Sequence, residues 1–270
     1  MNLTGIYLYG FVPPADELDL SGIEGIDSAG PILALNLGAT TAVIGQVQVE
    51  AFEAALSSGA DGGPDPSWVI PRALKHEAIL EAVQARSPVL PARFGTLFSS
   101  SSALEGMASE HQSAIARFFT DLGDRLEWSL RGYYNPDQAA DLLINGDPEF
   151  SRRWQALPES PGTRYFREKK LREEARLAAR QTAARTAETV RVMLRTLTDD
   201  VRSLPLRGRE APGREMILHE TFLLPRKLAS EALGLLKGNS VEPIDGLMTW
   251  VPSGPWPPFH FCPDLGGPES

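Results

Sequence analysis

The segment from Thr163 to Val201 contains neither glycine nor proline, and this feature constrains the fold more than any other in the chain. At 1.5 Å per residue it predicts a helical rod of roughly 55 to 60 Å. Apolar and small residues recur in it mostly at intervals of three and four, which predicts one buried stripe with a thin, alanine-rich middle. The stripe comprises Phe166, Ala175, Ala179, Thr182, Thr186, Val190, Met193, Leu197 and Val201.

Short runs rich in β-branched and aromatic residues, bounded by glycine or proline, predict strands in both halves of the chain. The predicted strands cover residues 5–12, 32–37, 40–49, 89–90, 126–131, 204–207, 216–224 and 247–251. Gly38-Ala39 separates the second strand from the third, so these two are expected to form a hairpin. Residues 57–67 are rich in Gly, Pro, Asp and Ser and predict a surface loop.

Three further helices are predicted. Pro71 suits the start of one, whose apolar stripe ends near Pro88. The serines at 99–102 can cap a second helix, which ends about Gly123. The third covers about 225–236. A length of 270 residues favours two domains.

We therefore expect an α+β protein with an N-terminal α+β domain at residues 1–135 and a C-terminal one at 136–270. The second would contain the long helix 163–201 and a closing segment rich in proline and aromatic residues.

Charge argues against several partners. The chain carries 26 Lys and Arg against 35 Asp and Glu, a net charge of −9 that repels phosphate backbones and anionic lipid. We therefore expect neither nucleic acid nor a lipid membrane as a partner. The charge is segregated, because Arg164 to Arg202 holds eleven basic and six acidic residues, a balance of +5 against −14 elsewhere. The single cysteine, Cys262, and the absence of a secretory leader predict a cytoplasmic location.

Motifs for chemistry are missing. The sequence has no Gly-rich phosphate loop, no HExxH and no CxxC pair. His260 and Cys262 would share a face if they lay on a strand, and Cys262 could pair with His219 as a nucleophile, but nothing in the sequence brings these groups together. Asp199-Asp200 fits a solvated surface better than an acid/base pair. We therefore expect no catalytic, cofactor-binding or metal-ligating residue, and no enzyme.

Two segments stand out as candidate structural or partner-contact sites. In Pro88 to Phe98, Arg93 carries five donors, Phe94 is apolar and Gly95 permits a sharp bend. In Gly254 to Phe261, three prolines stiffen a path that carries aromatic residues. The candidates there are Trp256, Pro257, Phe259 and Phe261. Each set can either cover the protein's own core or face a partner.

Five blocks spread over nearly the whole chain carry a family resemblance. They are GIYLYGFV, ALKHEAILEAV, SPVLPARFGTLF, RLEWSLRGYY and SGPWPPFHF. Together they resemble the gas vesicle protein F/L family (GvpF/GvpL). The resemblance implies an N-terminal ferredoxin-like domain and a C-terminal modified ferredoxin-like domain with a long helix.

The resemblance also implies a minor gas vesicle component or assembly factor. Such a protein would bind the apolar shell protein GvpA, and other gas vesicle accessory proteins, and support vesicle nucleation by limiting aggregation. An exposed strand edge or an aromatic groove could make that contact by β-augmentation. The alternatives are a small-molecule enzyme with an interdomain cleft and a general protein-interaction scaffold.

Overall fold

A computed structural model describes residues 4–15, 18–27, 30–59, 63–206, 213–228, 234 and 248–265. The chain forms two compact units. Unit 1 comprises Met1–Leu126 and Trp256–Ser270, and unit 2 comprises Glu127–Pro255. The division lies before the predicted boundary after residue 135, because the strand at Arg125–Tyr134 belongs to the sheet of unit 2. The closing segment, expected in the C-terminal domain, belongs to unit 1.

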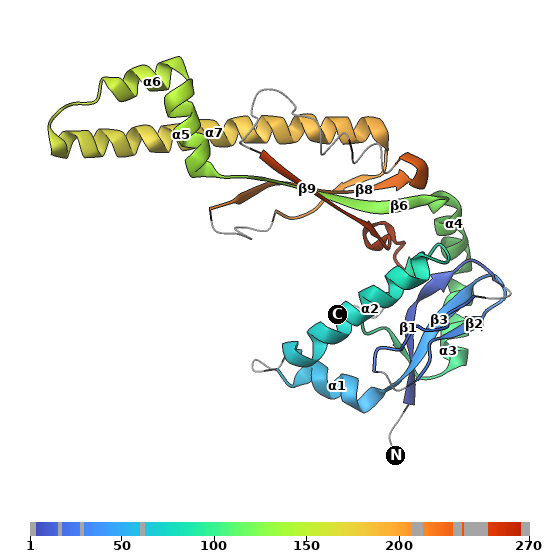
Figure 1. Ribbon diagram of the computed structural model, residues 1–270. Helices are drawn as coiled ribbons and strands as arrows, with labels where there is room; N and C mark the ends of the chain where they lie inside the picture. Colours follow the sequence, from blue (N-terminus) through green and yellow to red (C-terminus); the bar gives the residue numbers. More distant parts are fainter. Residues whose placement is uncertain are drawn as a thin grey trace. The chain divides into compact units, whose positions relative to one another are not determined.

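Unit 1 is built on a sheet whose pairings are antiparallel. Its strand order is β2-β3-β1-β4, and β5 also pairs with β1 (Figure 1). The strands are β1 (Thr4–Val12), β2 (Leu33–Asn36), β3 (Thr41–Gln48), β4 (Leu90–Pro91) and β5 (Leu97–Phe98). Leu33 lies opposite Ile44 and Asn36 opposite Thr41, so the predicted hairpin is confirmed.

Four helices accompany this sheet: α1 (Val49–Ser57), α2 (Pro66–Gln84), α3 (Ser101–Glu110) and α4 (Gln112–Leu122). Phe52 of α1 and Leu80 of α2 pack into one core with Tyr7 and Tyr9 of β1, so α1 and α2 cover one face of the sheet. In Figure 1, α3 and α4 lie on the other side of the strands.

Two of the predicted helices in unit 1 have different bounds. α2 begins at Pro66, not at Pro71, because the Asp65 carboxylate accepts the Ser67 N–H at 2.9 Å and caps the helix earlier. Pro71 lies inside the helix. Ser100 caps Ala103 as the serine run predicts, but the helix divides at His111 into α3 and α4.

Unit 2 has a four-stranded sheet of order β7-β8-β6-β9. The strands are β6 (Arg125–Tyr134), β7 (Val201–Ser203), β8 (Glu215–Pro225) and β9 (Met248–Trp256), and the helices are α5 (Pro136–Gly146), α6 (Pro148–Gln155) and α7 (Pro161–Leu197). If the four main strands of each unit are numbered by their order in the sequence, their order across the sheet is 2-3-1-4 in both units. This order is that of a ferredoxin-like sheet, so the two-unit α+β prediction is confirmed.

The predicted long helix is α7, which ends at Leu197 because Thr198 is extended. Its buried residues are Leu171, Ala175, Ala179, Ala183, Thr186, Ala187, Val190 and Leu194. Phe166 was wrongly predicted to be buried, since it is 72% exposed. It precedes Leu171 by five residues, which places it about 140° around the helix from the buried stripe. Val201 lies in β7, beyond the helix.

The remaining predictions for unit 2 have mixed outcomes. β8 confirms the strand at 216–224, and β9 begins at Met248 and runs on to Trp256. The strand predicted at 204–207 is displaced to Val201–Ser203, and Arg207 lies outside the described residues. Most of the helix predicted at 225–236 also lies outside them. In the part of the chain that the structure describes, no helix is long and apolar enough to cross a membrane.

Candidate partner-binding site

Arg93, Phe94 and Gly95 form the turn that links β4 to β5. The Thr96 N–H and hydroxyl both donate to the Arg93 carbonyl, at 3.2 and 2.7 Å, and Gly95 has a φ of +83°. That backbone conformation favours glycine, so the sequence prediction of a bend at Gly95 is explained. The Arg93 side chain is exposed.

Phe94 enters an aromatic cluster made with Tyr7, Tyr9, Phe52 and His76. Its ring centroid lies 6.0 Å from His76, 6.3 Å from Phe52 and 6.4 Å from Tyr7. Tyr7, Tyr9 and Phe52 are fully buried. Phe94 therefore covers the core of unit 1. In the predicted motif, Arg93 is exposed, Phe94 packs on the core, and Gly95 adopts the backbone conformation that the turn requires.

A chain of hydrogen bonds ties His76 to this turn. His76 Nε2 lies 3.1 Å from the Ala92 carbonyl, which can only accept, so Nε2 carries the proton. The Tyr7 hydroxyl then donates to Nδ1 at 2.9 Å and accepts the Gly95 N–H at 3.1 Å. Burial lowers the pKa of His76 to about 4, so the ring is neutral at pH 7. Burial also raises the pKa of Tyr9 to about 12.

The closing segment packs onto the same core. Pro257 and Pro258 are buried, and Phe259 contacts the cluster. Cys262 Sγ lies 3.2 Å from the Pro258 carbonyl and 3.8 Å from that of Pro91. Trp256 and Phe261 are half-buried. Residues Phe259–Phe261 form a 3₁₀ turn and not a strand, so the alternation considered for His260 and Cys262 does not apply.

Three of the five sequence blocks lie in unit 1, in β1, α2 and the β4–β5 turn, together with residues 256–261 of the closing block, while RLEWSLRGYY forms β6. Sequence reasoning missed the partners of Phe94, above all Tyr7, Phe52 and His76. A signal existed for His76, because it precedes Ile79, Leu80 and Val83 on one helix face. Nothing in the sequence pairs that face with the turn.

A different feature of unit 1, the edge strand β2, is open to a partner. Leu33 is 46% exposed, and Ala34 and Asn36 are also exposed. No charged residue occurs between Asp27 and Glu50 in the sequence. Folded proteins usually protect sheet edges with charge, proline or brevity. β2 has four residues, more than β4, β5 or β7, and it has neither charge nor proline.

The other described edges are protected. β4 and β5 have two residues each and β4 contains Pro91, β7 carries Arg202, and β9 contains Pro252 and Pro255. β2 therefore differs from every other edge strand in the described part of the chain.

The register of the hairpin shows which backbone groups of β2 point outward. Leu37 donates its N–H to Thr40 at 2.9 Å, which makes this a hydrogen-bonded pair. Such pairs alternate along an antiparallel ladder, so Leu35 and Leu33 also bond to β3. Ala34 and Asn36 consequently direct their N–H and C=O groups away from β3. These groups can accept an added strand.

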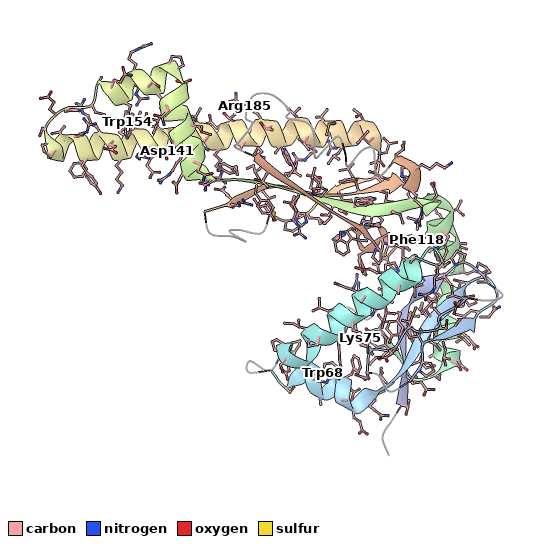
Figure 2. All side chains as sticks on the ribbon, in the orientation of Figure 1. Trp68, Lys75, Phe118, Asp141, Trp154 and Arg185 are labelled. Carbon is pink, nitrogen blue, oxygen red and sulfur yellow. The ribbon has the colours of Figure 1, made fainter. Side chains whose placement is uncertain are left out.

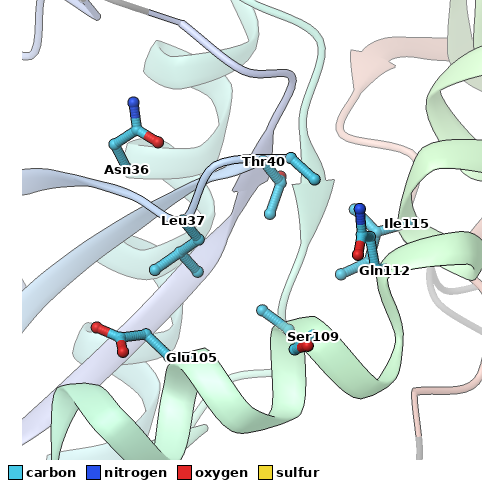
Figure 3. Close-up of a pocket in the computed structure, with 9 residues that line it drawn as sticks. Asn36, Leu37, Thr40, Glu105, Ser109, Gln112 and Ile115 are labelled. Carbon is cyan, nitrogen blue, oxygen red and sulfur yellow. The ribbon is translucent and has the colours of Figure 1, made fainter.

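A pocket of about 420 Å³ lies at the end of β2 (Figure 3). Asn36, Leu37 and Thr40 line one side, and Glu105 and Ser109 of α3 line the other, with Ala39, Ala108, Gln112 and Ile115. The lining mixes apolar and polar side chains. It suits a side chain or a short segment that extends beyond β2.

Groups suited to catalysis are dispersed. Across the described ranges, no cluster of three His, Cys, Asp or Glu side chains could hold a metal ion. His219 lies 3.3 Å from the Pro205 carbonyl in unit 2, whereas Cys262 contacts carbonyls in unit 1. Asp199 is exposed, as expected for a solvated surface. The site that the geometry favours is a strand edge with an adjoining pocket.

The fold is that of a two-unit α+β protein. Its described residues contain no metal-binding cluster, and β2 is a sheet edge without charge or proline. The model of the family "Gas vesicle synthesis protein GvpL/GvpF" matches residues 5–263, so the chain belongs to the GvpL/GvpF family.

Relatives agree with this assignment. The chain is 25% identical over 267 residues to gas vesicle protein L of Streptomyces sp. (strain CB03234), covering 95% of this chain and 92% of that one. It is 23% identical over 206 residues to gas vesicle protein L of Haloferax mediterranei, covering 74% of this chain and 62% of that one.

Solved structures show the same fold. GvpF from Microcystis aeruginosa matches with a TM-score of 0.61 at 17% identity, over 95% of this chain and 98% of that one. GvpF from Anabaena sp. PCC7120 matches with a TM-score of 0.65 at 16% identity, over 96% and 98%.

Proposed function

We propose that this protein is a minor gas vesicle component or assembly factor that binds the apolar shell protein GvpA through the edge of β2. Family membership supports a role in gas vesicles. The observation that carries the proposed contact is the uncharged edge, where the backbone N–H and C=O groups of Ala34 and Asn36 point away from β3.

The proposed mechanism is β-augmentation. A strand of the shell protein adds to β2, and its main chain bonds to Ala34 and Asn36. Its apolar side chains contact Leu33 and Leu35, and a residue beyond the strand enters the pocket beside Leu37. Occupying one edge of the shell protein would hold it back from uncontrolled edge-to-edge pairing until it joins the vesicle.

The role is proposed as non-enzymatic, cytoplasmic and located at the vesicle. Both ring nitrogens of His76, the most buried histidine, form hydrogen bonds within unit 1. This supports a structural role for His76. Among the residues predicted from sequence, exposed Arg93 is retained as a second contact with GvpA or with an accessory protein. Trp256 and Phe261 are retained as partial contacts.

Ala34→Pro tests the contact. Proline removes the outward N–H of Ala34 without removing a bond to β3, and proline is tolerated at such positions of edge strands. Ala34→Val is the matched control, because it keeps the N–H. We expect co-purification of tagged protein with GvpA to be lost for Ala34→Pro and kept for Ala34→Val, with both variants folded by circular dichroism. Equal capture of GvpA by the two variants would contradict the proposed edge.

The chaperone-like effect needs a separate assay. Light scattering of GvpA during dilution from denaturant should fall when the wild-type protein is present and should not fall with folded Ala34→Pro. If wild-type protein leaves scattering unchanged although it binds GvpA, the proposed limit on aggregation is wrong.

A further inference from the structure

The first turns of α7 carry an exposed group of cationic and aromatic side chains, called here the basic aromatic tip. It comprises Arg164, Tyr165, Phe166, Arg167, Lys169 and Lys170, all exposed. Tyr165 is 62% and Phe166 72% exposed, and their rings meet edge to face with centroids 5.6 Å apart. The tip lies in the first turns of α7, which begins at Pro161.

Four of the six cations further along α7 form ion pairs: Arg172, Arg176, Arg180 and Arg191. Arg172 contacts Asp141 at 2.6 Å and Glu168 at 3.7 Å, and Arg176 contacts Asp137 at 2.8 Å. Figure 2 shows Asp141 and Trp154 in the region where α5, α6 and α7 pack together. These pairs neutralise part of the positive charge in the middle of the helix.

The cations of the tip, in contrast, form no ion pairs within the described residues. They are Arg164, Arg167, Lys169 and Lys170. The one acidic residue among them, Glu168, is paired with Arg172. The four cations fall within about 9 Å of helix length. At 100° per residue, Arg164, Arg167 and Lys170 lie on one face of the helix, and Lys169 points about 160° away from Arg167.

Stability of the helix does not explain the basic aromatic tip. Cations in the first turns oppose the helix macrodipole, whose positive end lies there. Two large aromatic side chains exposed beside them gain nothing from burial in this chain. Tyr and Arg are, however, the residue types that contribute most at the centres of protein interfaces.

We propose that the basic aromatic tip binds a short acidic segment of a partner protein that carries apolar side chains between its carboxylates. The carboxylates would pair with Arg164, Arg167 and Lys170, and an apolar side chain would pack on Phe166, which lies one helical turn before Lys170. Charge complementarity and the 9 Å span fit three carboxylates. This surface lies in unit 2, whereas the β2 edge lies in unit 1, so the two proposals depend on different residues.

Nucleic acid and lipid fit the tip less well. The cations of the tip span only about 9 Å of helix, so an extended polyanion would run beyond them after a few contacts. The edge-to-face contact between Tyr165 and Phe166 also covers one ring face that a base would need for stacking. A short peptide meets neither obstacle.

Fluorescence anisotropy with a labelled peptide of alternating Glu and Leu tests the proposal on the full chain. We expect binding that weakens with salt, and a Kd about tenfold higher or more for Arg167→Glu, as loss of a charge-assisted contact implies. Arg185→Glu is the matched control, since Arg185 is exposed on the same helix, outside the tip, and the charge change is identical. Its Kd should stay close to that of the wild type.

Phe166→Ser should weaken binding even at high salt, because it removes the apolar contact. The melting temperature should be unchanged or slightly higher for Arg167→Glu, which shows that lost binding is not lost folding. The proposal is overturned if wild-type protein does not bind the peptide, or if Arg185→Glu weakens binding as much as Arg167→Glu. Tighter binding of single-stranded RNA or anionic vesicles than of the peptide would also overturn it.

Discussion

Units 1 and 2 share one strand order, but they bury their sheets with different side chains. In unit 1, Tyr7, Phe52 and Phe94 surround a neutral His76. In unit 2, α7 packs through alanines such as Ala179 and Ala183 and through a buried carboxylate, that of Glu220. Large rings fill space between elements, whereas alanines let backbones approach closely. Unit 2 also has a core of large side chains that includes Leu130, Leu218 and Phe222, so the two units differ in the aromatic cluster around His76 and in the alanine stripe of α7.

The two units also differ in net charge. Unit 1 has 6 Lys and Arg against 17 Asp and Glu, whereas unit 2 has 20 against 18. Unit 1 nevertheless contains the uncharged edge β2, and unit 2 contains the uncompensated basic aromatic tip. The β2 edge is thus an uncharged site in an acidic unit, and the tip is a positive site in a nearly neutral unit. The two surfaces therefore favour different contacts: strand addition at the uncharged β2 edge and carboxylate binding at the basic aromatic tip.

The largest effect is expected at the buried ion pair of unit 2. Arg191 Nε lies 2.8 Å from Glu220 Oε1, and the Ser203 hydroxyl donates to the same carboxylate at 2.9 Å. Arg191→Met would leave the buried Glu220 carboxylate without its cation and should cost about 3 to 5 kcal/mol in urea unfolding. The double variant Arg191→Met/Glu220→Leu should recover most of the loss. An additive loss in the double variant would contradict a buried charge as the cause.

A pH effect is expected from unit 1. His76 has its folded pKa lowered to about 4 from 6.5, so the unfolded state binds more protons between these values. The stability is therefore complete above pH 6.5 and falls as pH decreases towards 4, by about 2 kcal/mol at pH 5. The measurement is the free energy of unfolding at pH 5 and pH 7.5. His76→Gln should remove this part of the decrease, and an identical decrease in the variant would show that His76 is not responsible.

Close packing in unit 2 predicts a smaller loss. Ala183 is fully buried against Tyr134 and Ala139, so Ala183→Leu should cost about 1 to 3 kcal/mol through overpacking. Ala184→Leu, at the exposed neighbouring position, should change stability by less than about 0.5 kcal/mol. Equal effects at the two positions, measured by chemical denaturation, would mean that the alanine stripe is not tightly packed.

The smallest effect is expected for surface charge. Arg176 pairs with Asp137 and Glu173 but is 41% exposed, so Arg176→Gln should cost only about 0.2 to 1 kcal/mol at low salt. The loss should shrink further in high salt because the ions screen the pair. A loss that is larger and independent of salt would show that Arg176 contributes by packing.

Local signals in the sequence predicted much of this fold. The segment at 163–201 predicted α7, and Gly38-Ala39 predicted the β2–β3 hairpin, because both depend on neighbouring residues. Phe166 was wrongly predicted to be buried, because a periodic apolar stripe does not show at which residue other elements begin to pack against the helix. Pro71 was misplaced because the stronger capping signal, Asp65-Pro66, lay in a stretch that reads as loop.

The candidate site was less accessible to sequence reasoning. Arg93, Phe94 and Gly95 were identified, but their association with His76 and with Phe259 depends on contacts between distant segments. The edge of β2 left one local signal, the absence of charge between Asp27 and Glu50. Only the strand order shows that this uncharged strand is unprotected.

Amide hydrogen exchange measured residue by residue by NMR, with and without GvpA held soluble as a fusion, tests the proposed strand addition most directly. In the free protein, the Ala34 and Asn36 amides should exchange fast, whereas those of Leu33 and Leu35 are protected by β3. Binding of GvpA should slow Ala34 and Asn36 selectively. Unchanged exchange at both amides while GvpA is bound would contradict the proposal that β2 is the site.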